Sequence, residues 1–333
     1  MASDAGVVLS EVADGVATLT FNRPEANNGW SIEMEERYFE LLDEAERDDR
    51  VRAVVVTAAG RHFCPGLDLQ RLAAKADGVP APERQLPVTY PLRMPKPMVC
   101  AINGTAAGIG LVHAAVCDIR FAAEGTRMAT SFTRRGLVAE HLLSWLLPRM
   151  VGHANASDLL LSGRVFTAEE ALAMGFLNRV VPADALLDEA TAYARDLADN
   201  CSPLSMAQVK GQLLDDWLRS RGESLDAFEA LKDDPRRAAE LAEGVASFRE
   251  KRPPRFAPLP YGPCSTRGRS RPGWRRASSG GTSTPGSRPS APAATTSRPA
   301  ADTWPPWSTT AWRCRPGRSS TAGGLPAPTR WRR

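Results

Sequence analysis

The first part of the chain carries apolar residues in short runs of the length typical of strands. Residues 7–12 and 16–21 are two such runs, and they flank the dipeptide Asp14-Gly15. A Gly-containing pair between two apolar runs favours a tight β-hairpin. Ser31 then stands where a helix N-cap is expected, because the residues that follow repeat at helical spacing. These residues form one apolar face: Met34, Tyr38, Leu41 and Ala45.

Two continuous apolar runs follow, at residues 51–57 and 98–102. Runs of this length without alternation are typical of strands that are buried on both faces. A helix is expected to begin near Gly108, after the second run. Between the two runs, residues 71–94 are polar and interrupted by glycine and proline, which predicts a variable loop near the mouth of a pocket.

The second half of the chain is expected to become helical. Residues 140–150 are predicted as a helix, and Thr167 with Glu170 has the spacing of a capping box. A helix stop at Gly175 and a short strand over residues 176–181 follow. From residue 183 to residue 250 the pattern is helical throughout. It contains two apolar stripes, made of Leu186, Ala190, Tyr193 and Leu197 and of Leu213, Leu214, Trp217 and Leu218.

Composition narrows the class of protein. The 333 residues are 43% hydrophobic, which is enough for a sizeable core. Neither a run of about 18 apolar residues nor a signal-peptide pattern occurs, so the chain is expected to be cytoplasmic, without a membrane partner. The six cysteines and four histidines show no metal-ligand spacing. We therefore expect no metal site and no disulfide framework.

The net charge of +4 averages two unlike segments. Residues 262–333 contain thirteen arginines and one acidic residue, Asp302, for a charge of +12. Subtracting this charge from +4 leaves −8 for residues 1–261, so nothing there indicates a nucleic-acid surface. The basic segment is rich in Arg, Pro, Ser, Thr, Gly and Ala, a composition that predicts disorder. Translation of GC-rich coding DNA in the wrong reading frame gives a similar amino-acid composition, so this tail is interpreted as a frameshift product.

Two glycine turns, over residues 63–69 and 103–110, follow strand-like runs. Glycine lets the backbone adopt a positive φ and approach a ligand closely, so that two such turns can aim N–H groups at one oxygen atom as an oxyanion hole. Two other interpretations are open. Gly108-Ile109-Gly110 is half of a dinucleotide-binding fingerprint, but His113 occupies the place of the third glycine. Each turn alone is also compatible with ordinary strand-to-helix punctuation.

The pair of turns, at this separation, resembles the crotonase superfamily, the enoyl-CoA hydratase/isomerase family. The resemblance extends from about residue 7 to residue 253. It implies an α/β fold, a spiral of repeated strand-strand-helix units that ends in helices. It implies that acyl-CoA thioesters of fatty acid metabolism are the ligands and that coenzyme A enters as part of the substrate, with no other cofactor. Its oxyanion donors correspond to the N–H groups of Leu67 and Ile109, with Gly66, Asp68 and Gly108 as substrate-binding neighbours.

The resemblance also points to a departure in the acid/base chemistry. The positions of the two hydratase glutamates are occupied here by Val112 and Phe132. Glu140 matches the catalytic glutamate of some isomerases of the family, whereas its alternative interpretation is a first-turn helix acid that the helix dipole stabilises. A single base suffices to move a double bond, so isomerisation or single-glutamate hydration of an enoyl-CoA is the expected reaction. A non-catalytic acyl-CoA binder and a thioester hydrolase or dehalogenase are the alternatives.

The resemblance further implies a domain organisation and an assembly. Residues 1–200 would form the crotonase-like core, and residues 201–261 would form a helical trimerisation region. In the family this region covers the CoA site of a neighbouring subunit. Phe248 and Lys251 match the aromatic residue and the cation that would contact the adenine and a phosphate, with a solvated helix end as the alternative. A homotrimer or a dimer of trimers is therefore expected.

Overall fold

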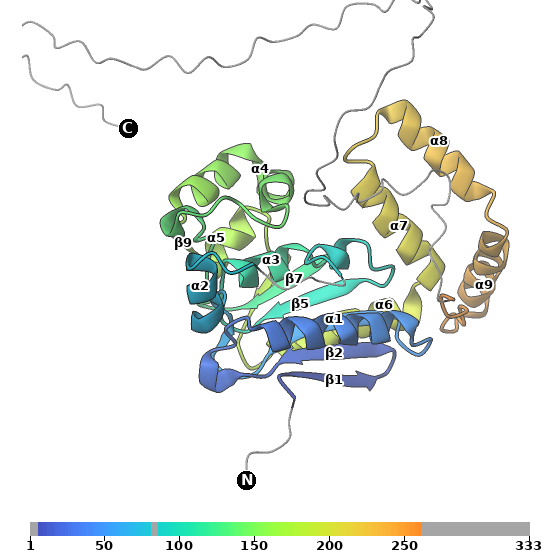
Figure 1. The fold of residues 1–333 in the computed structure, drawn as a ribbon. Helices are drawn as coiled ribbons and strands as arrows, with labels where there is room; N and C mark the ends of the chain where they lie inside the picture. Colours follow the sequence, from blue (N-terminus) through green and yellow to red (C-terminus); the bar gives the residue numbers. More distant parts are fainter. Residues whose placement is uncertain (1–5, 81–85, 261–333) are drawn as a thin grey trace, which may run out of the picture. The chain divides into compact units, whose positions relative to one another are not determined.

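The computed structural model describes residues 6–80 and 86–260 (Figure 1). The predicted basic tail, with Cys264 and Cys314, lies outside these residues. Among the described residues, helices and strands alternate through the first 181 residues, and helices alone follow.

The larger of two sheets has six strands. They are, in chain order, β1 (Val8–Ala13), β2 (Val16–Phe21), β3 (Ala53–Ala58), β5 (Met98–Ile102), β7 (Ile119–Ala123) and β10 (Arg179–Val181). They lie side by side in the same order. Strands β1 and β2 form the predicted antiparallel hairpin, and every later pair is parallel. All residues of β3 and β5 are buried, as their continuous apolar runs predict.

The smaller sheet has four short strands that the sequence patterns did not reveal. They are β4 (His62–Cys64), β6 (Thr105–Ala107), β8 (Arg127–Ala129) and β9 (Val165–Thr167). The first three pair in parallel, and β9 is antiparallel to β8. After β3, β5 and β7 the chain passes from the larger sheet to the smaller one, and a helix follows each time. This repetition is the strand-strand-helix unit that the resemblance implies.

Local capping signals position the helices of this region. Helix α1 (Ile32–Arg47) begins as predicted, because the Ser31 side chain accepts a hydrogen bond from the N–H of Met34. Helices α2 (Leu69–Ala76), α3 (Ile109–Ala115) and α5 (Ala168–Ala173) follow strands β4, β6 and β9. The capping box of Thr167 and Glu170 is confirmed. Short 3-10 helices occupy Pro24–Ala26, Tyr90–Leu92 and Thr133–Arg135.

Two predictions for this region are wrong in detail. Helix α4 (Leu143–Ser162) begins three residues later than expected, because His141 and Leu142 adopt positive φ angles of 53° and 63°. The segment of residues 71–94, predicted as a loop, contains most of helix α2. Its glycine and proline residues break the chain only after the helix has ended.

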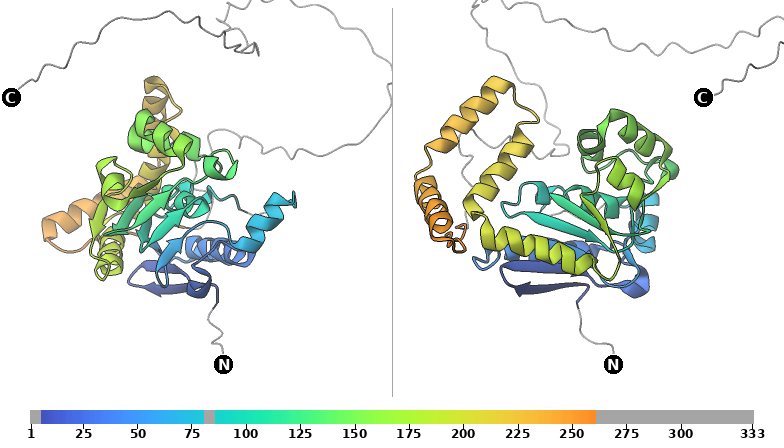
Figure 2. Two further views of the ribbon diagram at one scale, coloured as in Figure 1. Left: turned by 90° about the vertical axis from the view of Figure 1, so that its left-hand side faces the viewer. Right: turned by 180° about the vertical axis from the view of Figure 1, so that it is seen from behind.

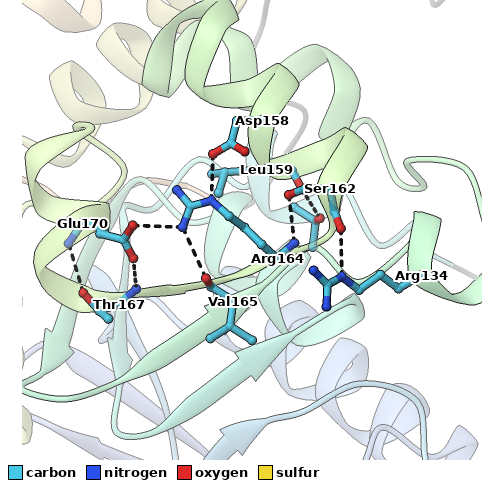
Figure 3. A network of polar contacts seen from close by, with 9 residues as sticks. Arg134, Asp158, Leu159, Ser162, Arg164, Val165, Thr167 and Glu170 are labelled. Carbon is cyan, nitrogen blue, oxygen red and sulfur yellow. Dashed lines mark hydrogen bonds and ion pairs between the residues drawn. The ribbon is translucent and has the colours of Figure 1, made fainter. Parts of the chain in front are cut away.

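An arginine joins helix α4 to the elements that follow it (Figure 3). The Arg164 guanidinium forms ion pairs with Asp158 in α4, at 2.7 Å, and with Glu170 in α5, at 2.9 Å. The backbone between them carries β9. This network fixes the outer strand of the smaller sheet between the two helices.

Four helices complete the described chain: α6 (Leu186–Asn200), α7 (Pro203–Asp215), α8 (Arg221–Lys232) and α9 (Arg236–Glu250). Helix α6 packs on the larger sheet through small buried residues, Ala190, Ala194 and Ala198. Helices α7 to α9 extend beyond the sheets (Figures 1 and 2). Among the described residues the second predicted apolar stripe is only partly covered, because Leu213 and Leu218 are 68% and 73% exposed whereas Trp217 packs against Trp145. No helix of the described residues is long and apolar enough to cross a membrane.

Candidate active site

The two glycine turns lie next to each other at one edge of the smaller sheet. Strand β4 pairs in parallel with β6, and Cys64 aligns with Ala106. The carboxyl ends of neighbouring parallel strands meet at the same edge of a sheet. Gly66 follows the end of β4, and Gly108 follows the end of β6. The sheet thus brings together two segments that are about 40 residues apart in the chain.

Gly66 and Gly108 have backbone conformations that other residues rarely adopt. Gly66 has a φ of 136°, and Gly108 has a φ of 53° with a ψ of −120°. A Cβ atom placed on Gly66 would lie 3.8 Å from the carbonyl oxygen of Ala107, and one on Gly108 would lie 4.0 Å from the Cα of Gly66. The two turns are therefore in direct contact, and glycine is required here for its φ angle rather than to avoid a collision.

The N–H of Leu67 is directed away from the nearest backbone segment. Trp30 forms an isolated parallel bridge with Leu67. In this bridge the N–H of Trp30 donates to the carbonyl of Gly66 at 2.8 Å, and its carbonyl accepts from the N–H of Asp68 at 3.3 Å. In a parallel bridge the N–H of the central residue points to the opposite side. Within residues 6–80 and 86–260, the Leu67 N–H has no hydrogen-bond acceptor.

The N–H of Ile109 is the first one in helix α3, and the first N–H groups of a helix have no acceptor within the helix. A Cβ atom on Gly110 would lie 1.9 Å from the carbonyl oxygen of Cys64, so the first turn of α3 rests directly on the end of β4. The described residues provide no other acceptor for the Ile109 N–H. Two available N–H groups thus stand on adjacent turns.

Asp68 connects the first turn to helix α2. Its carboxylate caps the helix by accepting a hydrogen bond from the N–H of Arg71 at 2.8 Å, and it lies 3.4 Å from the guanidinium of Arg23. The Asp68 carboxylate, which was predicted to contact substrate, therefore already binds Arg71 and Arg23. This arrangement fixes the direction in which the chain leaves Leu67.

Glu140 lies in the loop that precedes helix α4, and not in the first turn of the helix. Its Oε1 atom accepts a hydrogen bond from the Nζ of Lys75 in helix α2 at 2.6 Å. The two side chains are 29% and 37% exposed. The next two residues, His141 and Leu142, have left-handed backbone conformations, which non-glycine residues adopt at a cost and which are common at functional sites.

The residues that the resemblance matches to the two hydratase glutamates are apolar and closed to solvent. Val112 in helix α3 is fully buried, and Phe132 is nearly so. Neither position can hold a water molecule by hydrogen bonds or deliver a proton. The thiol of Cys64, in the first turn, is also unreactive, because burial raises its pKa to about 12.

The sequence analysis did not predict a group of buried polar contacts next to the first glycine turn. Arg71 in helix α2 forms an ion pair with Glu35 of helix α1 at 2.9 Å. The same carboxylate oxygen accepts a hydrogen bond from the indole N–H of Trp30 at 2.9 Å. Both charged side chains are nearly buried. No local spacing signals the Arg71–Glu35 pair, because the two residues lie far apart in the sequence and on different helices.

The remaining predicted residues lie at the end of helix α9. Phe248 is 85% exposed, and Lys251 ends the helix with a φ of 52°. Their predicted contacts with CoA require a neighbouring subunit and stay a prediction. The described residues contain no group of three or more His, Cys, Asp or Glu side chains that could hold a metal ion.

Comparison with known proteins identifies the family of the chain. The family model for enoyl-CoA hydratase/isomerase matches residues 11–258. The chain is 37% identical over 257 residues to 1,2-epoxyphenylacetyl-CoA isomerase of Escherichia coli (strain K12), covering 75% of the chain and 97% of that protein. It is 33% identical over 248 residues to an enoyl-CoA hydratase of Alternaria alternata, covering 73% and 83%. A crystal structure of an enoyl-CoA hydratase from Polaromonas sp. JS666 superposes with a TM-score of 0.70 at 29% identity, covering 75% of this chain and all of that one.

The chain belongs to the enoyl-CoA hydratase/isomerase family. The predicted α/β crotonase fold with its C-terminal helical region is confirmed, and so is the prediction of an enzyme of the enoyl-CoA hydratase or isomerase kind. These comparisons leave the choice between hydratase and isomerase open.

Proposed function

We propose that this chain binds the thioester carbonyl of an acyl-CoA between the N–H groups of Leu67 and Ile109 and that Glu140 transfers the proton. The observation that carries the proposal is a pair of N–H groups on two adjacent glycine turns for which residues 6–80 and 86–260 offer no acceptor. Two such donors stabilise the negative charge that develops on the oxygen when the thioester becomes an enolate. One donor of this kind contributes about 3 to 4 kcal/mol to the transition state.

The reaction that fits a single carboxylate is the movement of a double bond from C3 to C2. Glu140 takes a proton from C2, and the electron pair of that C–H bond moves into the enolate. When the enolate collapses, the double bond shifts into conjugation with the thioester, and the proton held by Glu140 passes to C4. No atom is gained or lost, so a water molecule is not needed.

Buried apolar residues favour isomerisation over two-glutamate hydration. Val112 and Phe132 occupy the glutamate positions of the family hydratases, which leaves Glu140 as the one carboxylate at the family's active positions. Hydration that uses Glu140 alone is the second reaction of the proposal.

The experiment that separates these reactions compares turnover of 3-enoyl-CoA and 2-enoyl-CoA by the same preparation. Isomerisation predicts loss of 3-enoyl-CoA with formation of the conjugated 2-enoyl thioester. Hydration predicts loss of 2-enoyl-CoA with formation of the 3-hydroxyacyl product. Binding of acyl-CoA without turnover of either substrate would contradict the proposal and identify a non-catalytic binder, whereas release of free CoA would identify a hydrolase.

We also propose that the chain acts as a homotrimer or a dimer of trimers in the cytoplasm. Apolar side chains on the last three helices support an assembly, because exposed apolar groups at this density are typical of interaction surfaces. The exposed set on helices α7 to α9 is Val209, Leu213, Leu225, Phe228, Leu241, Val245 and Phe248. Within the trimer, Phe248 and Lys251 would contact the CoA bound to a neighbouring subunit.

A further inference from the structure

Helix α2 connects the two parts of the candidate site. Leu67, which carries the first N–H donor, is followed directly by Asp68, the N-cap of the helix. Lys75 lies in the last turn of the same helix, where its Nζ donates to Glu140 at 2.6 Å. One helix of eight residues therefore joins the oxyanion donor at its beginning to the proposed base at its end.

The beginning of this helix is held rigidly. Arg71 is only 9% exposed and forms an ion pair with Glu35, which also accepts from Trp30. Arg71 and Lys75 are four residues apart, so they lie on the same side of the helix. Because the buried pair fixes the rotation of the helix about its axis, the ammonium group of Lys75 is held on the side where Glu140 lies.

The contact leaves one oxygen of Glu140 available. Lys75 binds Oε1, and within the described residues Oε2 has no hydrogen-bond partner. A charge-assisted hydrogen bond between an ammonium and a carboxylate is short and fixes the orientation of the carboxylate plane. The carboxylate is thus oriented by one oxygen atom while the other oxygen atom can accept a proton.

We propose that Lys75 is a positioning residue for Glu140, and this inference rests on the proposed function of Glu140. Lys75 keeps the carboxylate in one orientation and ties the loop of residues 137–142 to helix α2. The base and the oxyanion donor Leu67 are thereby held at a constant relative position. His141 and Leu142 have left-handed backbone conformations, which make this loop costly to form. A contact with helix α2 therefore stabilises the loop.

Three other charged groups on helix α2 and on the segment before Glu140 either bind another group or carry a negative charge. On helix α2, Arg71 is bound to Glu35, and Asp77 ends the helix as an acidic residue that would repel the carboxylate. On the segment that precedes Glu140, the guanidinium of Arg134 donates to the carbonyl of Ser162. Among the described residues, Lys75 is the cation that forms an ion pair with Glu140.

The test is a double-mutant cycle measured with 3-enoyl-CoA. Lys75→Met removes the charge and keeps the length of the side chain, and Lys75→Arg keeps the charge. We expect Lys75→Met to lower kcat by about 3- to 10-fold with KM changed less than about twofold, and Lys75→Arg to recover most of the loss. In the Glu140→Gln background, Lys75→Met should lower kcat no further, because Lys75 acts through Glu140.

Lys232→Met provides the matched control. Lys232 pairs with Glu229 in helix α8, and both side chains are about half exposed, so its removal should leave kcat and KM unchanged. Lys75→Gln is a second neutral variant, and acyl-CoA binding together with the circular dichroism spectrum verifies that each variant is folded. A purely structural role would lower kcat in the Glu140→Gln background as well.

The outcomes separate this inference from the proposed function. If Glu140→Gln loses activity but Lys75→Met and Lys75→Gln behave like Lys232→Met, the inference is overturned and the proposed function stands. An additive loss in the double variant also overturns it. If Glu140→Gln keeps full activity, Glu140 is not the base, and the proposed function and the inference both fail.

Discussion

Replacement of Gly108 by alanine tests the oxyanion hole by moving one donor without filling space. A Cβ atom at this position has no neighbour closer than 4.0 Å, so the substitution causes no collision. The cost arises from the backbone, because the combination of a φ of 53° and a ψ of −120° is largely restricted to glycine. Relief of this strain, about 1 to 3 kcal/mol, would rotate the peptide that carries the Ile109 N–H.

The expected magnitudes differ between stability and catalysis. A strain of this size lowers Tm by about 2 to 12 °C in a domain of this length. Loss of one oxyanion donor lowers kcat by about 10² to 10³. Steady-state turnover of 3-enoyl-CoA and a thermal melt of the same preparation therefore measure two separable effects.

Gly125→Ala is the control for strain alone. Gly125 has a φ of 72° and open space around its Cα, and it lies before the amino end of β8, whereas Gly66 and Gly108 follow the carboxyl ends of β4 and β6. This variant should lose a similar amount of stability and keep the parent kcat. If Gly108→Ala retains the parent kcat, or if both variants lose kcat equally, the assignment of Ile109 as a donor is refuted.

Three further predictions concern titration, reactivity and assembly. Burial lowers the pKa of Lys96 to about 8 from 10.5, so the unfolded chain holds this proton between pH 8 and 10.5 whereas the folded chain releases it. The free energy of unfolding of the parent, relative to Lys96→Met, should rise across this range in denaturant titrations, and a constant difference would contradict it. The Cys64 thiol, with its pKa raised to about 12, should resist alkylation at pH 8 until the chain unfolds, as followed by mass spectrometry. Light scattering should give the mass of a trimer or hexamer, and a fully active monomer would exclude this assembly.

The sequence predicted those turns and helix caps that depend on hydrogen bonds between neighbouring residues. The hairpin at Asp14-Gly15, the Ser31 cap and the capping box of Thr167 all form as expected. Each depends on hydrogen bonds within about four residues, so the sequence alone contains the necessary information. The positive φ angles of Gly66 and Gly108 were expected in the same way, from the place of the two glycine turns after strand-like runs.

The features that were missed depend on contacts between distant segments. The parallel pairing of β4 with β6 brings the two turns together, and each strand is only three residues long, too short for a periodic pattern. Glu140 was expected inside a helix because nothing in the sequence marks Leu142 as a left-handed residue. Apolar side chains on helices α7 to α9, such as Leu213 and Leu241, are left exposed by the described residues, and an apolar pattern does not say whether its partner is the same molecule.

The most direct test of the account is the single-turnover rate of Glu140→Gln with 3-enoyl-CoA, measured by the appearance of the conjugated thioester. This substitution preserves size and hydrogen-bonding capacity but removes the base. We predict a rate about 10² to 10⁴ below that of the parent, with the affinity for a non-reactive acyl-CoA changed little. A parent-like rate in Glu140→Gln would contradict the central claim that this single glutamate transfers the proton.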